Sequence, residues 1–394
     1  MSKLDELIAE LCPEGVEYKT IEEAALLTMG TSPEGNTINH DPNNGYEFHQ
    51  GKSFFGPMIL GHSDLFTSAP IKFAEPGSIV MSVRAPVGDT NLTDRKIAIG
   101  RGLCTMTGRD SLETKYLYYY LNSRIDEIRK RSTGSTFESI NSNDLKSFLI
   151  PLPPLPIQRE IVRILDTFTE LTAELTAELT ARKRQYEYYR DLLLGFSDRK
   201  DISVNLVKLG EVGRVSMCKR ILKAETKPEG DVPFFKIGTF GKTPDAYISQ
   251  EIYDEYRKSY PFPKTGDILI SAAGTIGRTV IYDGKPAYYQ DSNIVWIDND
   301  ERTVLNRYLY YCYALKPWAV STGGTIARLY NDNISKAKIP VPPLSEQRRI
   351  VAILDRFDAL CNDLTSGLPA EIEARRKQYE YYRDKLLTFK EKSA

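Results

Sequence analysis

The chain has 394 residues, 41% hydrophobic and 10% aromatic, which is enough for two or three folded domains. No apolar run reaches the ~20 residues that a membrane-spanning helix needs, the N-terminus lacks a signal-peptide core, and five scattered cysteines form no Cys-x-x-Cys pair. We therefore expect a cytoplasmic protein, and the net charge of −1 excludes a globally basic nucleic-acid-binding protein, so that any such binding must use local patches.

The first 150 residues predict a β-rich domain. The stretch "GSIVMSVRAPVG" at 77–88 contains β-branched residues and ends in a glycine, which is typical of a strand followed by a turn. The segments "YLYYY" at 116–120 and "STGST" at 132–136 come after it. We assign residues 1–150 to this domain.

Residues 151–198 predict a long helix. The Pro153–Pro154 pair ends the preceding strand and sets the helix start. From 157 to 196, apolar residues alternate spacings of four and three, as in the seam of a coiled coil. These residues begin with Ile157, Ile161, Ile164, Phe168, Leu171 and Leu175. A helix of about 40 residues would be roughly 60 Å long and unstable alone, so it needs a packing partner.

Residues 199–394 repeat the plan of the first half. "IPLPPLPIQREIVRILDTF" at 150–168 returns at 339–357 with 13 of 19 residues identical, and "ARKRQYEYYRDLLLGF" at 181–196 returns at 374–389 with 12 of 16 identical. Weaker echoes are "GDILISAAGTIG", "YLYYC" and "STGGT" in the second half. We assign 199–340 to a second β-rich domain and 341–394 to a second helical region, in which "SGLP" predicts a break at Pro369.

The fold class that follows is α+β: two β-rich α/β domains separated by two long antiparallel helices, with an internal pseudo-twofold repeat. Charge favours the antiparallel direction, because each helix begins acidic and ends basic. The acidic residues are Glu170, Glu174 and Glu178 in the first helix and Asp355, Asp358 and Asp363 in the second. The basic residues are Arg182, Lys183 and Arg184 in the first and Arg375, Arg376 and Lys377 in the second.

The first helix also contains a tandem tetrad, "TAELTAEL" at 172–179, with Leu171, Leu175 and Leu179 in the seam. The offset between the two copies changes from 189 to 193 across this interval, so its length varies by one tetrad. One tetrad adds ~6 Å of helix and a net turn of ~40°, and B-DNA turns by ~34 to 36° per base pair. The tetrads therefore suit a length setting between the two domains, and the alternative is that they serve only as a good helix-forming segment.

The duplicated "PLPPLPIQREIVRILD" and "PVPPLSEQRRIVAILD", the "QYEYYRD" blocks and the tetrads resemble the specificity (S) subunits of type I restriction-modification enzymes. The resemblance implies two target-recognition domains, each reading one half of a bipartite site on double-stranded DNA. It implies two methyltransferase (M) subunits that carry S-adenosylmethionine, and optional restriction (R) subunits that use ATP and Mg. In one branch of the family, the number of tetrads sets the length of the unspecified spacer.

Motifs for catalysis by the chain itself are missing, so we expect a non-catalytic subunit that binds no cofactor or metal. The Pro-Pro pairs lack the flanking residues of an adenine methyltransferase, and "GYEFHQGKS" at 45–53 has five residues between its glycines where a phosphate loop has four. The three histidines have no metal-ligand spacing. The alternative function is a coiled-coil protein–protein adaptor without direct DNA contact, which the near-neutral charge favours.

Base readout needs hydrogen-bond donors in loops that face a DNA groove. In the first domain the candidates are His49, Gln50, Lys52, Arg84, Arg95, Lys96 and Arg101, with Ser135 and Thr136 of "STGST" suited to phosphates. In the second domain they are Lys219, Arg220, Lys223, Lys236, Lys242, Arg278 and Gln290, with Thr325 of "STGGT".

Overall fold

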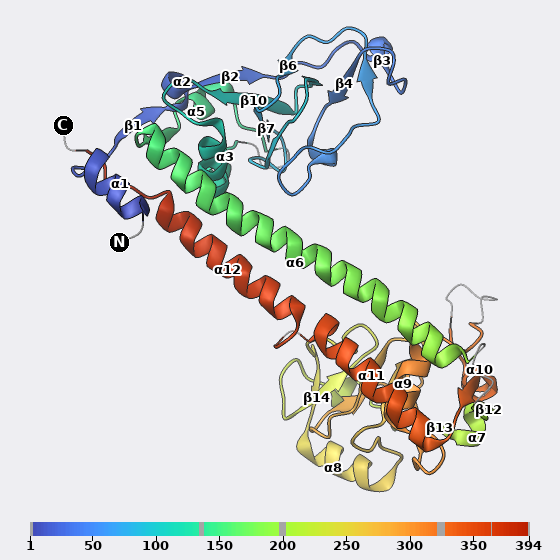
Figure 1. The fold of residues 1–394 in the computed structure, drawn as a ribbon. Helices are drawn as coiled ribbons and strands as arrows, with labels where there is room; N and C mark the ends of the chain where they lie inside the picture. Colours follow the sequence, from blue (N-terminus) through green and yellow to red (C-terminus); the bar gives the residue numbers. More distant parts are fainter. Residues whose placement is uncertain (1–2, 134–137, 197–201, 321–327, 364, 393–394) are drawn as a thin grey trace. The chain divides into compact units, whose positions relative to one another are not determined.

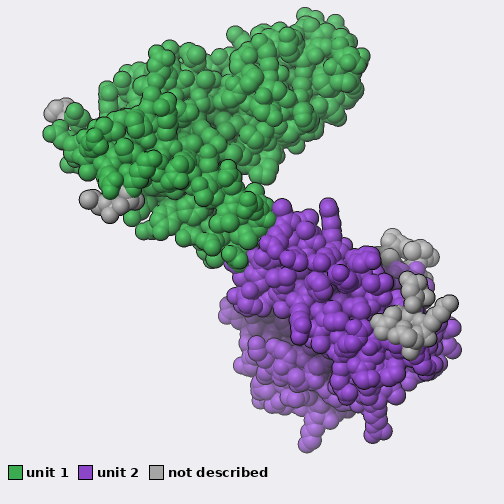
Figure 2. All heavy atoms as spheres, viewed as in Figure 1, with its two compact units in different colours: residues 1–176, 371–394 green, residues 177–370 purple. Residues whose placement is uncertain are grey.

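The computed structural model describes residues 3–133, 138–196, 202–320, 328–363 and 365–392. They form two compact units, one made of residues 1–176 with 371–394 and the other of residues 177–370 (Figure 2). The helices in these described ranges include none that is long and apolar enough to cross a membrane.

The described residues of unit 1 form three sheets. A four-stranded antiparallel sheet has the order β2 (Ala25–Met29), β10 (Leu103–Gly108), β7 (Ile79–Ser82), β8 (Thr90–Leu92). A five-stranded sheet has the order β3 (Ile38–Asn39), β5 (Phe66–Thr67), β4 (Tyr46–His49), β9 (Ile97–Ile99), β6 (Phe73–Ala74). The third sheet pairs β1 (Glu17–Thr20) with β11 (Leu149–Leu152).

The shorter helices of unit 1 are α1 (Lys3–Leu11), α2 (Ile21–Ala24), α3 (Thr114–Ser123), α4 (Ile125–Lys130) and α5 (Ser142–Lys146). Helix α3 contains the "YLYYY" segment, and all of its five residues are buried in the main core of the unit.

Unit 2 repeats the four-stranded and two-stranded sheets of unit 1 and three strands of its five-stranded sheet, which confirms the predicted internal repeat. Figure 1 shows the path of the chain through both units. Its four-stranded sheet has the order β13 (Gly213–Ser216), β19 (Ile294–Asn299), β16 (Ile268–Ser271), β17 (Thr279–Ile281). A second sheet has the order β15 (Tyr247–Ile248), β14 (Val232–Phe235), β18 (Tyr288–Tyr289), and β12 (Asn205–Lys208) pairs with β20 (Lys338–Val341). The shorter helices are α7 (Leu209–Val212), α8 (Gln250–Ser259), α9 (Asn306–Ala314) and α10 (Asn331–Lys336).

The long helices agree with the sequence-based prediction. Helix α6 (Leu155–Gly195) is continuous over 41 residues, begins in unit 1 and ends in unit 2. The second helical region is broken into α11 (Leu344–Asn362) and α12 (Leu368–Leu386), and the five residues 363–367 lie between them. Pro369 lies in the first turn of α12. We attribute the four extra residues of the second copy to the connection between α11 and α12.

Within each unit, α6 runs antiparallel to its partner helix, α12 in unit 1 and α11 in unit 2 (Figure 1). Phe168 stacks on Tyr382 at 5.7 Å between ring centroids in unit 1, and Tyr189 stacks on Phe357 at 5.6 Å in unit 2. The two phenylalanines are repeat-related, as are the two tyrosines, so in each unit the Phe of one copy meets the Tyr of the other. This exchange is what an antiparallel pseudo-twofold pair requires.

The predicted direction of the helices is thus confirmed, but the expected contribution of charge is not what the contacts show. The ion pairs that the structure describes for the basic blocks lie within one helix, from Arg182 to Glu178 and from Arg376 to Glu373. The reason is geometric, since an i,i+3 or i,i+4 carboxylate is already within reach of each arginine. The contacts that the structure describes between the helices include the aromatic pairs of Phe168 with Tyr382 and of Tyr189 with Phe357.

A buried glutamine joins each domain to its long helix. Gln158 of α6 is fully buried; its Nε2 donates to the carbonyls of Ser111 and Pro153 at 2.9 and 2.7 Å, and its Oε1 accepts from the N–H of Glu113 at 2.8 Å. The repeat-related Gln347 makes the same three bonds in unit 2, to Thr303, Pro342 and Leu305. Because each of its polar atoms has a partner, hydrogen bonds offset the cost of removing the amide from water.

A carboxylate supports each of these joints from about two helical turns further along, eight residues after the glutamine. Asp166 of α6 accepts from the Tyr119 hydroxyl at 2.6 Å and the Lys115 ammonium at 2.7 Å. In unit 2, Asp355 of α11 accepts from the Tyr311 hydroxyl and the Arg307 Nε. The repeated sequence blocks therefore encode one domain-to-helix joint that is built twice.

Candidate nucleic-acid interface

In unit 1, the loops that follow β4 and β9 share one edge of the five-stranded sheet. The two strands are parallel, so their carboxyl ends meet, and the Gly100 N–H donates to the His49 carbonyl at 2.8 Å. Gln50 and Arg101, the exposed residues after these strands, therefore lie at the same edge. The Arg101 N–H also donates to the Ser32 hydroxyl at 3.2 Å, which adds the loop after β2.

Glycine allows these loops to pack backbone against backbone. A Cβ on Gly102 would lie 2.2 Å from the Gln50 carbonyl, and a Cβ on Gly30 would lie 2.2 Å from the Gly100 carbonyl. Arg84 joins the same edge, because the N–H of the preceding Val83 donates to the Gly102 carbonyl at 2.9 Å. We call this group, Gln50, Arg84 and Arg101 with their loops, the first loop cluster.

Lys52 lies beside the first loop cluster, in the short turn after β4. Its ammonium forms an ion pair with Asp89, and the same carboxylate accepts from Arg129 at 3.1 Å. Two cations thus share one anion, so the local charge is net positive. Ser135 and Thr136, the predicted phosphate contacts, lie outside the described residues.

Unit 2 builds the corresponding edge from the loops after β14 and β18. These strands are also parallel, and the Gln290 N–H donates to the Phe235 carbonyl at 3.0 Å, as Gly100 does to His49. The edge encloses a cavity of about 520 Å³. Four predicted residues line it, namely Arg220, Lys223, Lys236 and Gln290. Together with the adjoining residues Asp291, Ser292 and Arg328, they form the second loop cluster.

Arg328 is a residue of this cluster that the sequence-based candidates did not include. Its Nη2 donates to the Ser292 carbonyl at 3.0 Å, and its guanidinium lies 6.0 Å from the ring of the exposed Tyr330. Only its position three residues after the "STGGT" segment could have indicated it. The backbone pairings of Leu329 with Ala272 and of Ile140 with Val83 show that Arg328 corresponds to Ser139 of unit 1.

The remaining candidates of unit 2 do not line this cavity. Lys219 lies over the ring of Tyr260 at 5.0 Å, and the half-buried Arg278 donates to the Phe240 carbonyl at 2.8 Å. Lys242 lines a separate cavity of about 300 Å³ together with Tyr289. Thr325 lies outside the described residues.

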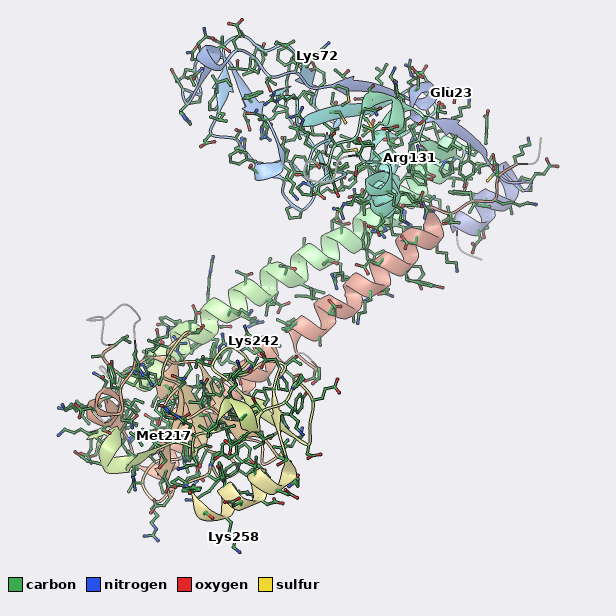
Figure 3. The ribbon with its side chains drawn as sticks, turned by 180° about the vertical axis from the view of Figure 1, so that it is seen from behind. Glu23, Lys72, Arg131, Met217, Lys242 and Lys258 are labelled. Atoms are coloured by element: carbon green, nitrogen blue, oxygen red, sulfur yellow. The ribbon has the colours of Figure 1, made fainter. Side chains whose placement is uncertain are left out.

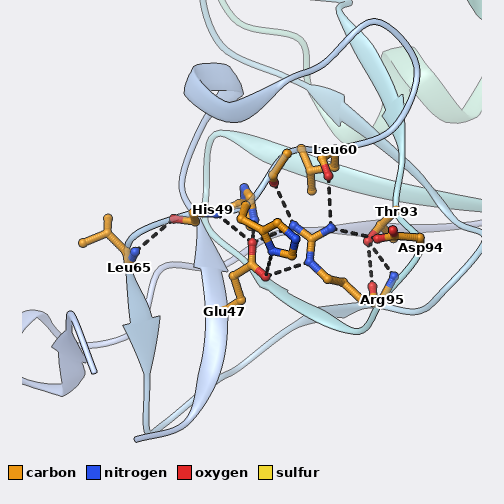
Figure 4. A network of polar contacts seen from close by, with 10 residues as sticks. Glu47, His49, Leu60, Leu65, Thr93, Asp94 and Arg95 are labelled. Atoms are coloured by element: carbon orange, nitrogen blue, oxygen red, sulfur yellow. Dashed lines mark hydrogen bonds and ion pairs between the residues drawn. The ribbon is translucent and has the colours of Figure 1, made fainter. Parts of the chain in front are cut away.

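His49 cannot contact DNA in this structure, which corrects its assignment as a DNA-reading residue. Its side chain is fully buried, and its Nε2 lies 2.8 Å from the Glu47 carboxylate (Figure 4). Burial lowers the pKa of His49. The alternation of a strand explains the error, because the side chain of His49 points inward while the next residue, Gln50, is exposed.

Arg95 and Lys96 precede β9 and therefore lie at the opposite end of that strand from Arg101. Arg95 donates to both Glu47 oxygens at 2.7 Å and to the carbonyls of Leu60 and Gly61. Lys96 forms an ion pair with Glu75 at 2.7 Å. Arg95 is a structural residue that ties a loop to the sheet.

The Glu47 carboxylate is the centre of that network. Burial acts to raise its pKa, but hydrogen bonds from Arg95, the Ser63 N–H and His49 outweigh burial and lower the pKa to about 2. A carboxylate whose pKa is depressed on folding stabilises the folded state above its unfolded pKa, and this stability is lost as the pH falls through the folded value.

We expect Glu47→Gln to destabilise unit 1 by about 3 kcal/mol at neutral pH, since it leaves the partly buried Arg95 guanidinium without its anion. Thermal unfolding and hydrogen exchange over residues 45–100 measure the effect. Glu17→Gln, which removes an exposed ion pair, is the control. The difference between Glu47→Gln and the wild type should shrink between pH 4.5 and pH 2; a difference that persists at pH 2 would assign it to packing.

A repeated aromatic pair marks each long helix. Tyr188 of α6 and the repeat-related Tyr381 of α12 have 64% and 63% of their surface exposed. Each lies edge-on against the next tyrosine, at 5.5 Å for Tyr188 and 5.3 Å for Tyr381. Exposed tyrosines on helices that are otherwise charged are typical of protein–protein contact sites.

Comparisons with known proteins agree with this architecture. Residues 13–182 and 202–374 each match the family model described as the type I restriction modification DNA specificity domain. A putative type I restriction enzyme specificity subunit of Haemophilus influenzae is 44% identical over 95% of this chain and 96% of its own length. A type I restriction enzyme specificity subunit of Escherichia coli is 38% identical over 70% of each chain.

Two solved structures share the fold. The S subunit of a type I restriction-modification system from M. genitalium has a TM-score of 0.57 at 18% identity and covers 95% of this chain and 96% of its own. A chain from a structural study of complex assembly and conformational transition in a type I restriction-modification system has a TM-score of 0.61 at 19% identity, covering 96% and 98%.

Proposed function

The chain belongs to the family of type I restriction-modification DNA specificity subunits, and on this premise we propose that each unit reads one half of a bipartite site on double-stranded DNA. The observation that carries the proposal is the contrast between a repeated backbone and unlike loops. The same strand pairing presents Gln50 and Arg101 in unit 1, whereas the equivalent positions in unit 2 hold Lys236 and Asp291, with Gln290 directly before Asp291. Two equivalent edges with different donors suit two independent choices of sequence.

The near-neutral net charge is compatible with this role, because the donors are concentrated in the two loop clusters. Half or more of protein–DNA hydrogen bonds go to phosphates and sugars, and the base-edge contacts supply specificity. We assign the loop clusters to both tasks, with lysines such as Lys223 on the backbone and planar side chains such as Gln50 and Arg101 on base edges.

The long helices would hold the two units at a set spacing and dock the partner subunits. The repeat-related surfaces around Tyr188 and Tyr381 offer two equivalent sites, which suits two M subunits. In this proposal the chain itself catalyses no reaction and acts in the cytoplasm; the M subunits hold S-adenosylmethionine, and optional R subunits hold ATP and Mg.

Sequencing of methylated adenines in cells with and without this gene tests the proposed function. We expect one bipartite motif to lose its methylation when the gene is deleted and to regain it when the gene is restored. A coiled-coil adaptor that never touches DNA predicts the opposite result, a methylome that does not depend on the gene. A methylated motif that depends on the gene but lacks two separated halves would contradict the proposal that each unit recognises one half-site.

A further inference from the structure

We propose that Arg220 reads a guanine in the second half-site and that Asp291 is a positioning residue that holds its guanidinium for that contact. The proposal rests on the proposed function and deepens it, because it names a base class and the residue that selects it. The evidence comes from the geometry of the ion pair, from the turn that holds Asp291 and from the negative charge that Asp291 places beside the contact.

The ion pair joins a mostly buried carboxylate to an arginine whose side chain is mostly exposed. The Arg220 Nε lies 2.9 Å from Asp291 Oδ2, and 67% of the Arg220 side chain is exposed, against 18% for Asp291. The guanidinium therefore extends toward solvent at the wall of the cavity, while its partner is mostly enclosed.

Asp291 is held by a tight turn. Its carbonyl accepts from the Asn293 N–H at 2.6 Å, and its Oδ2 also accepts from the Ser292 hydroxyl at 3.2 Å. Ser292 has a φ of 54°, a left-handed conformation that costs free energy in a residue other than glycine. Such strain persists where the surrounding structure determines the turn, and here the turn fixes the carboxylate that orients Arg220.

This orientation leaves the edge of the guanidinium that carries the two terminal nitrogens open to a ligand. Among the described residues, the contact of Arg220 uses Nε, so the two terminal nitrogens are available to another acceptor. Guanine presents two acceptors, N7 and O6, in the major groove, and the planar arginine fork matches them with two parallel hydrogen bonds. Holding the guanidinium in advance reduces the entropy lost when those bonds form.

A base edge fits this site better than a phosphate. The Asp291 carboxylate adjoins the position that a ligand of Arg220 would occupy, and it would repel a phosphate anion there more strongly than the uncharged edge of a base. Lys223 of the same cavity suits a phosphate, whereas Lys236 is already paired with Asp245 at 2.9 Å. The sign of the local charge thus separates the two roles.

The test uses the complete complex and the motif that its methylome defines. We expect Arg220→Ala to relax methylation at one G·C pair of one half-site and to leave the other half-site unchanged. In binding assays with a duplex that carries the motif and a duplex in which that G·C is replaced by A·T, the wild type should discriminate by about 10- to 100-fold. Arg220→Ala should bind the two duplexes within about twofold, and Asp291→Asn should discriminate at an intermediate level.

Several outcomes would overturn the proposal. If Arg220→Ala keeps the full motif and weakens both duplexes equally, with the salt dependence reduced by about one phosphate contact, Arg220 binds phosphate. If the complex fails to assemble with both Arg220→Ala and Arg220→Gln, the residue is structural. Arg302→Ala, which removes an exposed ion pair elsewhere in unit 2, is the matched control and should change nothing. If the wild type methylates no bipartite motif, the proposed function fails, a result distinct from an unchanged half-site.

Discussion

Inserting one further Thr-Ala-Glu-Leu tetrad after Leu179 is expected to abolish methylation of the original site and to create methylation at a site with the same two half-sites and a spacer longer by one base pair. The tetrads lie within the continuous helix α6, and the boundary between the two units, at residues 176 and 177, falls inside them. The insertion therefore changes the connection and leaves the cores of both units intact.

The rotation of the inserted tetrad explains the expected single base pair. Four residues add ~6 Å and a net turn of ~40°, close to the ~34 to 36° of one base-pair step, so the loop clusters stay in phase with the grooves. The half-buried Leu171, Leu175 and Leu179 are spaced by four, and a new leucine continues that row. The rise exceeds the ~3.4 Å of one base pair, and helix tilt or DNA bending at about 1 to 6 kcal/mol absorbs the difference.

Methylome sequencing of the insertion variant reads the outcome directly. The control is an insertion of one alanine at the same place, which turns the following helix by ~100° and breaks the leucine row, so that methylation should be lost without a new motif. An unchanged spacer after the tetrad insertion would reduce the tetrads to a helix-forming segment, and altered half-sites would mean that they take part in recognition.

Exchanging residues 16–150 for the first domain of another specificity subunit is expected to replace one half-site completely and to leave the other half-site and the spacer unchanged. The joint to α6 tolerates the exchange because Gln158 bonds to backbone groups of Ser111 and Glu113, which any sequence supplies. Specificity contacts at separate positions are roughly additive, so the second half-site should not respond.

The same methylome assay checks the exchange. Asp166 accepts hydrogen bonds from the side chains of Tyr119 and Lys115. The donor domain should therefore carry a tyrosine and a lysine at these positions, so that the joint to α6 is kept. A chimera that changes both half-sites would contradict the independence of the two units. The matching exchange of residues 199–340 should replace the other half-site.

Much of the architecture could be predicted from the sequence because it depends on local rules and on repetition. The heptad spacing from Ile157 onward predicted α6, and the "SGLP" segment predicted the break before α12. The two repeated blocks predicted two copies of one fold, and the matching sheet topologies confirm them. The antiparallel direction was correct as well, although the stacked pair of Phe168 and Tyr382 explains it better than charge does.

The candidate sites depended on the tertiary structure, because residues far apart in sequence meet there. Arg101 comes beside Gln50 only through the parallel pairing of β9 with β4, and Arg220 meets Asp291 across 71 positions. Strand alternation buried His49 and exposed its neighbour Gln50, a choice that short strands do not reveal in advance.

By itself, then, the sequence determined the repeat, the long helices and the family, since periodicity and duplication are written in the order of residues. Only the tertiary structure decided which charged side chains face solvent and which are consumed inside. Arg95 and Arg220 look alike in sequence, but one is bound to Glu47 and two carbonyls within unit 1, and the other extends from a fixed carboxylate into an open cavity. The difference arises because burial and hydrogen-bond partners are properties of the folded surroundings of a residue, not of its type.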